Sequence, residues 1–67
     1  MSYKEWLYFE LLNEGVIDED EYTIDELDKD TLLETTELDE LDFDNYEAQF
    51  EEHCKASGET PIWDLED

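Results

Sequence analysis

Carboxylates are the side chains of this sequence that could do chemistry. Its 67 residues include 24 Asp and Glu, opposed by three Lys and no Arg, so the net charge is −21. Carboxylates can ligate a divalent cation, act as a general acid and base, or attract a basic partner. Each of these roles needs a different arrangement, so the spacing of the residues decides between them.

The carboxylate spacing does not fit a calcium-binding EF-hand loop. Such a loop needs Gly at its sixth position and a bidentate Glu at its twelfth. A loop that begins at Asp18 has Thr23 and Lys29 at these two positions, and a loop that begins at Asp42 ends at His53. We therefore expect no specific metal ligands and no cofactor.

Nucleophilic catalysis is also poorly supported by the residues present. His53 and Cys54 are adjacent, and adjacent side chains on a helix point roughly 100° apart, which is unsuitable for a nucleophile and its base. Only two Gly occur, and they are far apart, so no glycine-rich phosphate loop is present. We expect no catalytic residue and no enzymatic activity. A single cysteine allows no intramolecular disulfide, which favours a cytoplasmic protein.

The first helix is predicted over residues 3–13. Ser2 is followed three residues later by Glu5, the capping-box pattern, and Gly15 provides a C-terminal stop. The helix carries more apolar residues than one buried stripe needs, so they either form the core or expose a surface for a partner or a homodimer. These apolar residues are Tyr3, Trp6, Leu7, Tyr8, Phe9, Leu11 and Leu12.

The middle of the chain is predicted to form two shorter helical segments. Thr23 begins a second capping-box pattern, which indicates a helix over residues 24–29. Another helical turn is expected over residues 30–34, capped by Asp30 or Thr31.

A longer helix is predicted in the second half of the chain, because four residues follow the i, i+3, i+7, i+11 spacing of one helical face. They are Phe43, Tyr46, Phe50 and Cys54. Asp42 or Asp44 is expected to cap this helix, and Gly58 to end it. Leu38 and Leu41 either extend the same face or belong to a separate turn.

The predicted fold is all-α, a small bundle of three to four short helices with an extended C-terminal arm. Residues 1–67 form one small acidic domain, and Ile62, Trp63 and Leu65 of the arm fold back on the core. Disorder is not expected, because 39% of the residues are hydrophobic and 13% aromatic. The apolar stretch near the N-terminus is too short and too interrupted by Glu for a signal peptide or a membrane span.

The sign of the charge indicates the class of partner. Phosphate contacts need Lys and Arg, so direct binding to nucleic acid is excluded, and anionic lipid repels the chain. A surface of carboxylates instead attracts proteins that are built to bind phosphate. Carboxylates three or four residues apart on a helix have Cβ atoms about 5–6 Å apart, which is of the same order as the phosphate spacing of a nucleic-acid strand.

Two segments carry this pattern, DEDEYTIDELDKD at 18–30 and ELDELDFDNYEAQFEE at 37–52. In size, charge and aromatic content the chain resembles the small acidic DNA-mimic proteins of phages and mobile elements, which include anti-restriction proteins, anti-CRISPR proteins and uracil-DNA glycosylase inhibitors. The resemblance implies a DNA-mimic inhibitor in the cytoplasm of the bacterial cell. Its partner would be a basic nucleic-acid-binding host protein, such as a nuclease, a glycosylase or a CRISPR effector.

Two acidic blocks are expected to contact this partner, a loop cluster and a row along the last helix. The residues are Asp18, Glu19, Asp20, Glu21, Asp25, Glu26, Glu37, Asp39, Glu40, Asp42, Asp44, Glu47 and Glu51. Charge reversal at Asp39, Glu40 and Asp44 together is expected to weaken binding without unfolding the domain.

Two other functions fit the composition. One is an acidic adaptor that regulates a basic transcription or replication protein without competing with nucleic acid, in which Trp6, Tyr8 and Phe9 would matter more than the carboxylates. The other is a salt-adapted domain without mimicry, which would fold only at high ionic strength.

Overall fold

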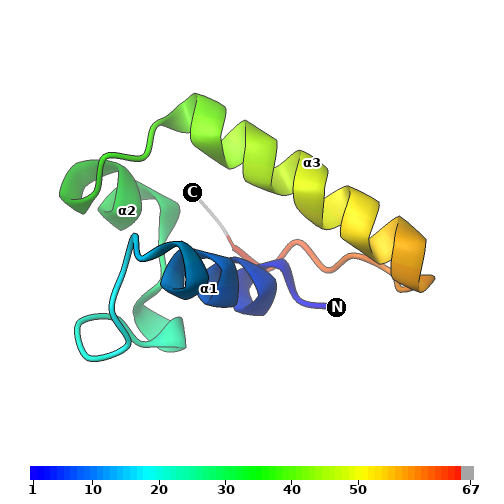
Figure 1. The fold of residues 1–67 in the computed structure, drawn as a ribbon, viewed down its shortest axis with the longest axis horizontal. Helices are drawn as coiled ribbons and strands as arrows, with labels where there is room; N and C mark the ends of the chain where they lie inside the picture. The colour runs from blue at the N-terminus through cyan, green and yellow to red at the C-terminus, as the bar shows by residue number, and fades with distance from the viewer. Residues whose placement is uncertain (66–67) are drawn as a thin grey trace.

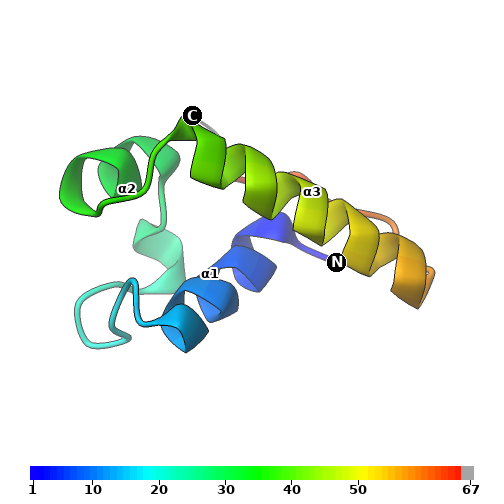
Figure 2. The ribbon, with the colours of Figure 1, turned by 45° about the horizontal axis from the view of Figure 1, so that its top comes forward.

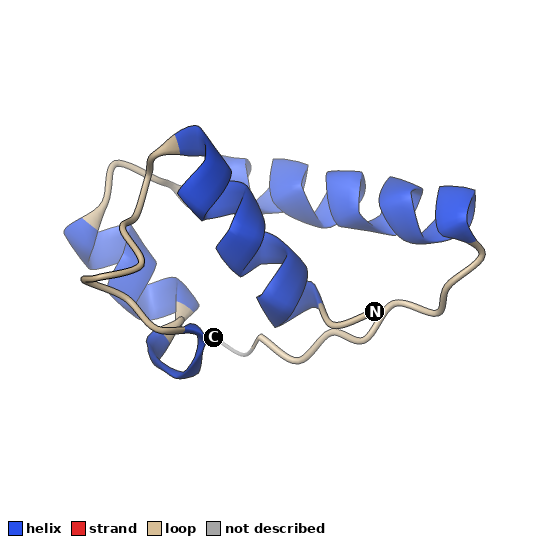
Figure 3. Ribbon diagram, turned by 60° about the horizontal axis from the view of Figure 1, so that its bottom comes forward, coloured by secondary structure: helices blue, strands red, loops and turns tan. Residues whose placement is uncertain are grey.

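The computed structural model describes residues 1–65 of the chain (Figure 1). Its elements are α1 (Tyr3–Glu14), a 3-10 turn η1 (Ile24–Glu26), α2 (Lys29–Thr35) and α3 (Glu40–Ser57), followed by an extended segment. Figure 3 shows only helices and loops in this part of the chain. The predicted all-α bundle with an extended C-terminal arm is confirmed, while the last two residues of the arm, 66 and 67, lie outside the described part.

Ser2 caps the start of α1 and Gly15 its end, as the sequence predicts, although of the expected capping box only the bond to the Ser2 hydroxyl is formed. The hydroxyl of Ser2 accepts a hydrogen bond from the backbone N–H of Glu5 at 3.2 Å. At the other end Gly15 adopts a left-handed conformation with φ 76°, which favours glycine because a Cβ atom is strained there. The helix buries Tyr3, Leu7 and Leu11, which recur every four residues along one face.

The middle of the chain differs from the prediction. The helix expected over residues 24–29 is only the three-residue turn η1, and Thr23 makes no side-chain capping bond. The backbone becomes extended at Leu27, whose side chain is buried in the core. Asp28 then caps α2, because its carboxylate accepts a bond from the Thr31 N–H at 3.3 Å. Burial of Leu27 thus outweighs the local preference for a continuous helix.

The start of α3 also differs from the prediction, by about one turn. The N-cap is Asp39, not Asp42 or Asp44. Asp39 Oδ1 accepts a bond from the Asp42 N–H at 3.0 Å, and Asp42 Oδ2 accepts one from the Asp39 N–H at 3.1 Å, which completes a capping box. Leu41 therefore lies inside α3, where it is 71% exposed and off the buried face. Leu38 precedes the helix and packs against the core.

The core lies between α1 and α3, and aromatic rings form its centre. Phe50 is fully buried, with ring centroids of Tyr3, Trp6 and Trp63 at 5.1, 5.5 and 5.1 Å. Figure 2 shows α2 beside the start of α3. The predicted buried face of α3 is confirmed, and its residues are Phe43, Tyr46, Phe50 and Cys54.

The extended segment after α3 returns to the N-terminus, as Figure 1 shows. Ile62 and Ser2 form a single parallel bridge, in which the Tyr3 N–H donates to the Ile62 carbonyl at 2.8 Å. The Asp64 carboxylate accepts bonds from the Ser2 hydroxyl and, at 2.8 Å, from the Lys4 N–H. Its partial burial raises the pKa of Asp64, but these hydrogen bonds outweigh that effect and hold the pKa below its ordinary value.

Candidate functional site

Four carboxylates form a regular row along one flank of α3. Their spacing of i, i+4, i+7 and i+11 places them on one side of the helix, and all four side chains are exposed. We call Glu40, Asp44, Glu47 and Glu51 the acidic row. At 1.5 Å per residue it extends over about 16 Å of the helix axis.

The buried face of α3 holds the acidic row in place. Phe43, Tyr46, Phe50 and Cys54 fix the helix to the core, so the carboxylates beside them have fixed backbone positions. Burial, and after it the charge of Glu47, raises the pKa of the Tyr3 hydroxyl well above its ordinary value. The acidic row therefore lies on a helix that is packed against the core, and it is not part of a flexible tail.

One cation lies at the C-terminal end of the acidic row. The Lys55 ammonium is 3.8 Å from Glu51 Oε1, and both side chains are largely exposed. Exposed pairs of this kind contribute at most about 1 kcal/mol. Lys55 also lies in the last turn of α3, where a positive charge interacts favourably with the helix dipole.

Two of the predicted contact residues have a structural role, which the sequence predicted for Asp42 as a helix cap but not for Asp39. Asp39 and Asp42 form the capping box of α3, and Asp42 is half-buried. Replacing an N-cap of this type costs about 0.5–2 kcal/mol. Charge reversal at Asp39 is consequently expected to destabilise α3, so it is a poor probe of partner binding.

The remaining predicted contacts lie away from α3. Residues 18–21 are exposed in a turn in which the N–H groups of Glu21 and Tyr22 donate to the Asp18 carbonyl at 3.1 and 2.9 Å. The Tyr8 hydroxyl donates to the Tyr22 carbonyl at 2.8 Å and so connects this turn to α1. Figures 1 and 2 both show the turn on the far side of α1 from α3. The two acidic blocks are separate surfaces, and Asp25, Glu26 and Glu37 are exposed between them along the chain.

The aromatic residues of α1 divide between core and surface. Tyr3 is buried, and Trp6 is partly buried with its ring centroid 5.5 Å from that of Phe50. Tyr8 also packs against the core, whereas Phe9 is 60% exposed. Tyr3, Trp6 and Tyr8 of α1 therefore belong to the core or pack against it, whereas Phe9 lies on the surface.

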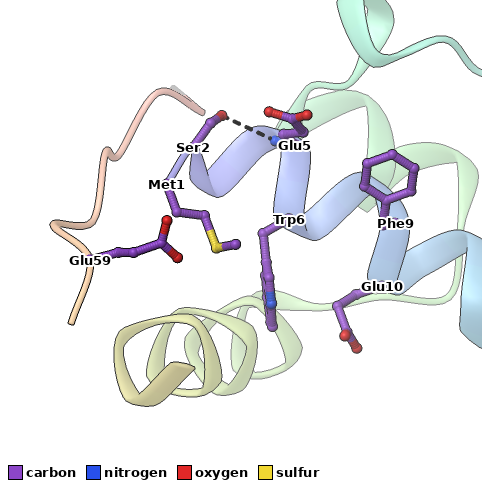
Figure 4. Close-up of a pocket in the computed structure, with 7 residues that line it drawn as sticks. All are labelled: Met1, Ser2, Glu5, Trp6, Phe9, Glu10 and Glu59. Carbon is purple, nitrogen blue, oxygen red and sulfur yellow. Dashed lines mark hydrogen bonds between the residues drawn. The ribbon is translucent and has the colours of Figure 1, made fainter. Parts of the chain in front are cut away.

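A cavity of about 370 Å³ opens beside Trp6 (Figure 4). Met1, Trp6 and Phe9 supply its apolar lining, and three carboxylates stand around them. These carboxylates belong to Glu5, Glu10 and Glu59. We call this cavity the Trp6 pocket.

None of the three carboxylates of the Trp6 pocket was predicted from the sequence to be a binding residue. A helical signal was present for two of them, because Glu5 and Phe9, and likewise Trp6 and Glu10, are four residues apart. Glu59 could not be found in this way, since it reaches the pocket only when the segment after Gly58 folds back.

A second cavity lies where the end of α1 meets the connection between α2 and α3. Glu14, Glu37, Leu38 and Asp42 contribute to its lining. The Tyr46 hydroxyl donates to Glu14 Oε2 at 2.6 Å, so Glu14 is already committed to a partner within the fold. Burial and this hydrogen bond raise the pKa of Tyr46 well above its ordinary value.

Among residues 1–65, no group of three or more His, Cys, Asp or Glu side chains is arranged to hold a metal ion. Cys54 is 1% exposed and continues the buried face of α3, whereas His53 is exposed. The two residues therefore face different environments, as their adjacent positions on a helix require. In the same part of the chain, no helix is both long and apolar enough to cross a membrane.

No known protein family, curated protein or solved structure matches this chain. Two surface features remain from which its function can be inferred. The first is the acidic row of α3, and the second is the Trp6 pocket with its ring of carboxylates. Both favour binding to a positively charged partner.

Proposed function

We propose that this protein is a DNA-mimic inhibitor. It occupies the nucleic-acid-binding surface of a basic host protein, in the cytoplasm of a bacterial cell, and it does so without enzymatic chemistry. The observation that supports this most strongly is the acidic row, in which four exposed carboxylates follow one flank of a helix, beside its buried face.

The charge spacing of the acidic row is comparable with that of DNA. Four charges over about 16 Å correspond to one charge every 5 Å or so along the helix axis. One strand of B-DNA carries one phosphate per about 3.4 Å of its axis. A basic channel built for phosphates would therefore meet a carboxylate at intervals of the same order.

The rest of the chain strengthens the field around the acidic row. Only three Lys oppose 24 carboxylates, so the potential is negative over most of the surface. The turn at 18–21 adds four exposed carboxylates on another side of the molecule. Such a charge distribution accelerates association with a basic protein and makes the rate fall as salt is added.

Rigidity distinguishes this protein from a flexible acidic tail. The capping box fixes the first turn of α3, and Gly58 ends the helix in a left-handed conformation with φ 72°. A tail must lose conformational entropy when it binds, whereas a helix that is already fixed to a core loses little. Fixed carboxylates can therefore bind a basic surface more tightly than the same number in a disordered chain.

One observation favours a second function, that of an acidic adaptor. Phe9 is 60% exposed on α1, and an adaptor would use such an aromatic contact together with the charges. An adaptor would regulate a basic transcription or replication protein at a surface that nucleic acid does not use. Competition with DNA separates the two functions, because DNA displaces only a mimic.

The proposal is tested by capture from a bacterial lysate at about physiological salt, followed by elution with duplex DNA. The bound proteins are identified before and after elution. Mimicry predicts that a nucleic-acid-binding protein is captured and that DNA releases it. Retention of that protein in excess DNA would replace the mimic with the adaptor.

A matched pair of variants assigns the binding to the acidic row. The row variant carries Asp44→Asn, Glu47→Gln and Glu51→Gln. The control variant carries Asp30→Asn, Glu34→Gln and Glu52→Gln, which removes the same charge from exposed residues outside the predicted contacts. Capture should fall strongly for the row variant and only slightly for the control.

A further inference from the structure

We propose that the Trp6 pocket receives an arginine side chain of the bound protein. This inference builds on the proposed function, because the same basic partner supplies the arginine. It adds one specific anchor to a surface that otherwise attracts its partner through many spread charges. The pocket's aromatic ring, its carboxylates and its size each favour this ligand.

The pocket has a fixed aromatic wall. Figure 4 shows the Trp6 indole between Met1 and Glu59 on one side and Glu10 on the other, with Phe9 further along α1. The inner side of the indole is held by the core, with ring centroids of Phe50 at 5.5 Å and Tyr46 at 6.5 Å. The wall is therefore present before a ligand binds.

The carboxylates around the wall are available for a cation. Among the described residues, no Lys or N-terminal ammonium forms an ion pair with Glu5, Glu10 or Glu59. The ammonium of Met1 is close by, but it donates to the Thr60 carbonyl at 2.9 Å. An entering cation would gain these carboxylates without displacing one that belongs to the chain.

The chemistry of the lining favours a guanidinium group. A planar cation can stack on the face of an indole and at the same time donate parallel N–H bonds to a carboxylate. A lysine ammonium can occupy the same space but lacks the planar fork. An apolar ligand would cover the carboxylates without providing hydrogen bonds, which costs free energy. A free phosphate or the phosphate of a nucleotide would be repelled by the three negative charges of the pocket.

The size of the cavity is consistent with a side chain. Small-molecule pockets typically measure about 300–1,000 Å³, and the Trp6 pocket, at about 370 Å³, lies near the lower end. The aliphatic stem of an arginine can lie along Met1 and Phe9 while its head reaches the carboxylates.

The test is a nuclear magnetic resonance titration of the isolated protein with N-acetyl-arginine N-methylamide. The indole N–H signal of Trp6 is the readout, and that of Trp63 is an internal reference. A Trp63→Phe variant assigns the two signals. We expect a saturable shift of the Trp6 signal, with a weaker response to the lysine analogue and none to the norleucine analogue.

Two double variants show whether the carboxylates carry the binding. Glu10→Gln with Glu59→Gln should weaken arginine binding about fivefold to tenfold, as expected for two partly exposed ion pairs. Glu34→Gln with Glu52→Gln removes the same charge away from the pocket and should leave it nearly unchanged. Neither pair contributes to the core, so dispersed spectra should show both variants to be folded.

The outcomes distinguish this inference from the proposed function. No saturable shift, an equal response to the norleucine analogue, or equal losses in the two double variants would overturn the pocket as a cation site. Equal affinity for the lysine and arginine analogues would overturn the assignment to arginine. Capture of a protein that DNA releases, together with a failed titration, would leave mimicry in place without this anchor. A successful titration with capture that DNA does not reverse would keep the anchor and contradict mimicry.

Discussion

Replacing Phe50 by Ala should remove most of the stability of this protein. The Phe50 side chain is fully buried and contacts three aromatic rings from both ends of the chain. Truncation of a buried Phe to Ala costs about 3–5 kcal/mol. A domain of this length has a total stability of roughly 3–10 kcal/mol, and repulsion within a net charge of −21 favours the lower part of that range.

The assay for Phe50→Ala is urea denaturation followed by far-ultraviolet circular dichroism. We expect the variant to be largely unfolded at low salt and to regain helix when salt screens the repulsion. Leu41→Ala is the matched control, because it truncates an apolar side chain of the same helix that is 71% exposed. It should leave the midpoint almost unchanged. A Phe50→Ala protein with the wild-type midpoint would refute the assignment of Phe50 to the core.

Two further predictions concern the capping box and the arm. Asp39→Ala should lower the free energy of unfolding by about 0.5–2 kcal/mol, because α3 loses its N-cap. The control Asp44→Ala should change this free energy little. Equal effects of the two variants in thermal melts would contradict the assignment of Asp39 as the cap. The Asp64 carboxylate has a lowered pKa when folded, so its bonds to Ser2 and the Lys4 N–H stabilise the fold above its ordinary pKa of 3.8 and lose that effect as the pH falls through the lowered value. The difference in unfolding free energy between wild type and Asp64→Asn should therefore shrink below pH 3.8. A difference that grows on acidification would contradict a lowered pKa of Asp64 in the folded protein.

Strong local signals allowed several features to be predicted from the sequence. Gly15 and Gly58 adopt positive φ values that other residues avoid. They therefore marked the C-terminal ends of α1 and α3 in the sequence. The spacing from Phe43 to Cys54 marked the buried face of α3. The return of the arm was predicted from its apolar residues, and Leu65 and the Trp63 ring do contact the core, whereas Ile62 remains 55% exposed and is held by backbone bonds to the N-terminus.

Other features depended on tertiary contacts or on choices between similar residues. The helix expected over 24–29 ends early because Leu27 leaves helical geometry to enter the core. Carboxylates at 39, 42 and 44 are all good caps, so propensity alone could not choose Asp39. The Trp6 pocket combines α1 with Glu59, and no local pattern connects segments so far apart along the chain.

The sequence predicted that carboxylates would form a row on the last helix, but not which carboxylates belong to it. The sequence placed seven carboxylates between 37 and 51 in one regular row. Four of them share one exposed flank of α3, whereas Asp39 and Asp42 are engaged in the capping box and Glu37 precedes the helix. The helix start decides this division, because shifting it by one turn changes which carboxylates are free of structural roles.

The most direct test of the central claim is the effect of duplex DNA on the captured partner, measured for wild type and for the row variant Asp44→Asn, Glu47→Gln, Glu51→Gln. Association rates by surface plasmon resonance at several salt concentrations provide the readout. Mimicry predicts that DNA blocks wild-type binding, and that the row variant associates more slowly with a weaker dependence on salt. Wild-type binding that is unaffected by DNA, or a row variant with unchanged association, would contradict it.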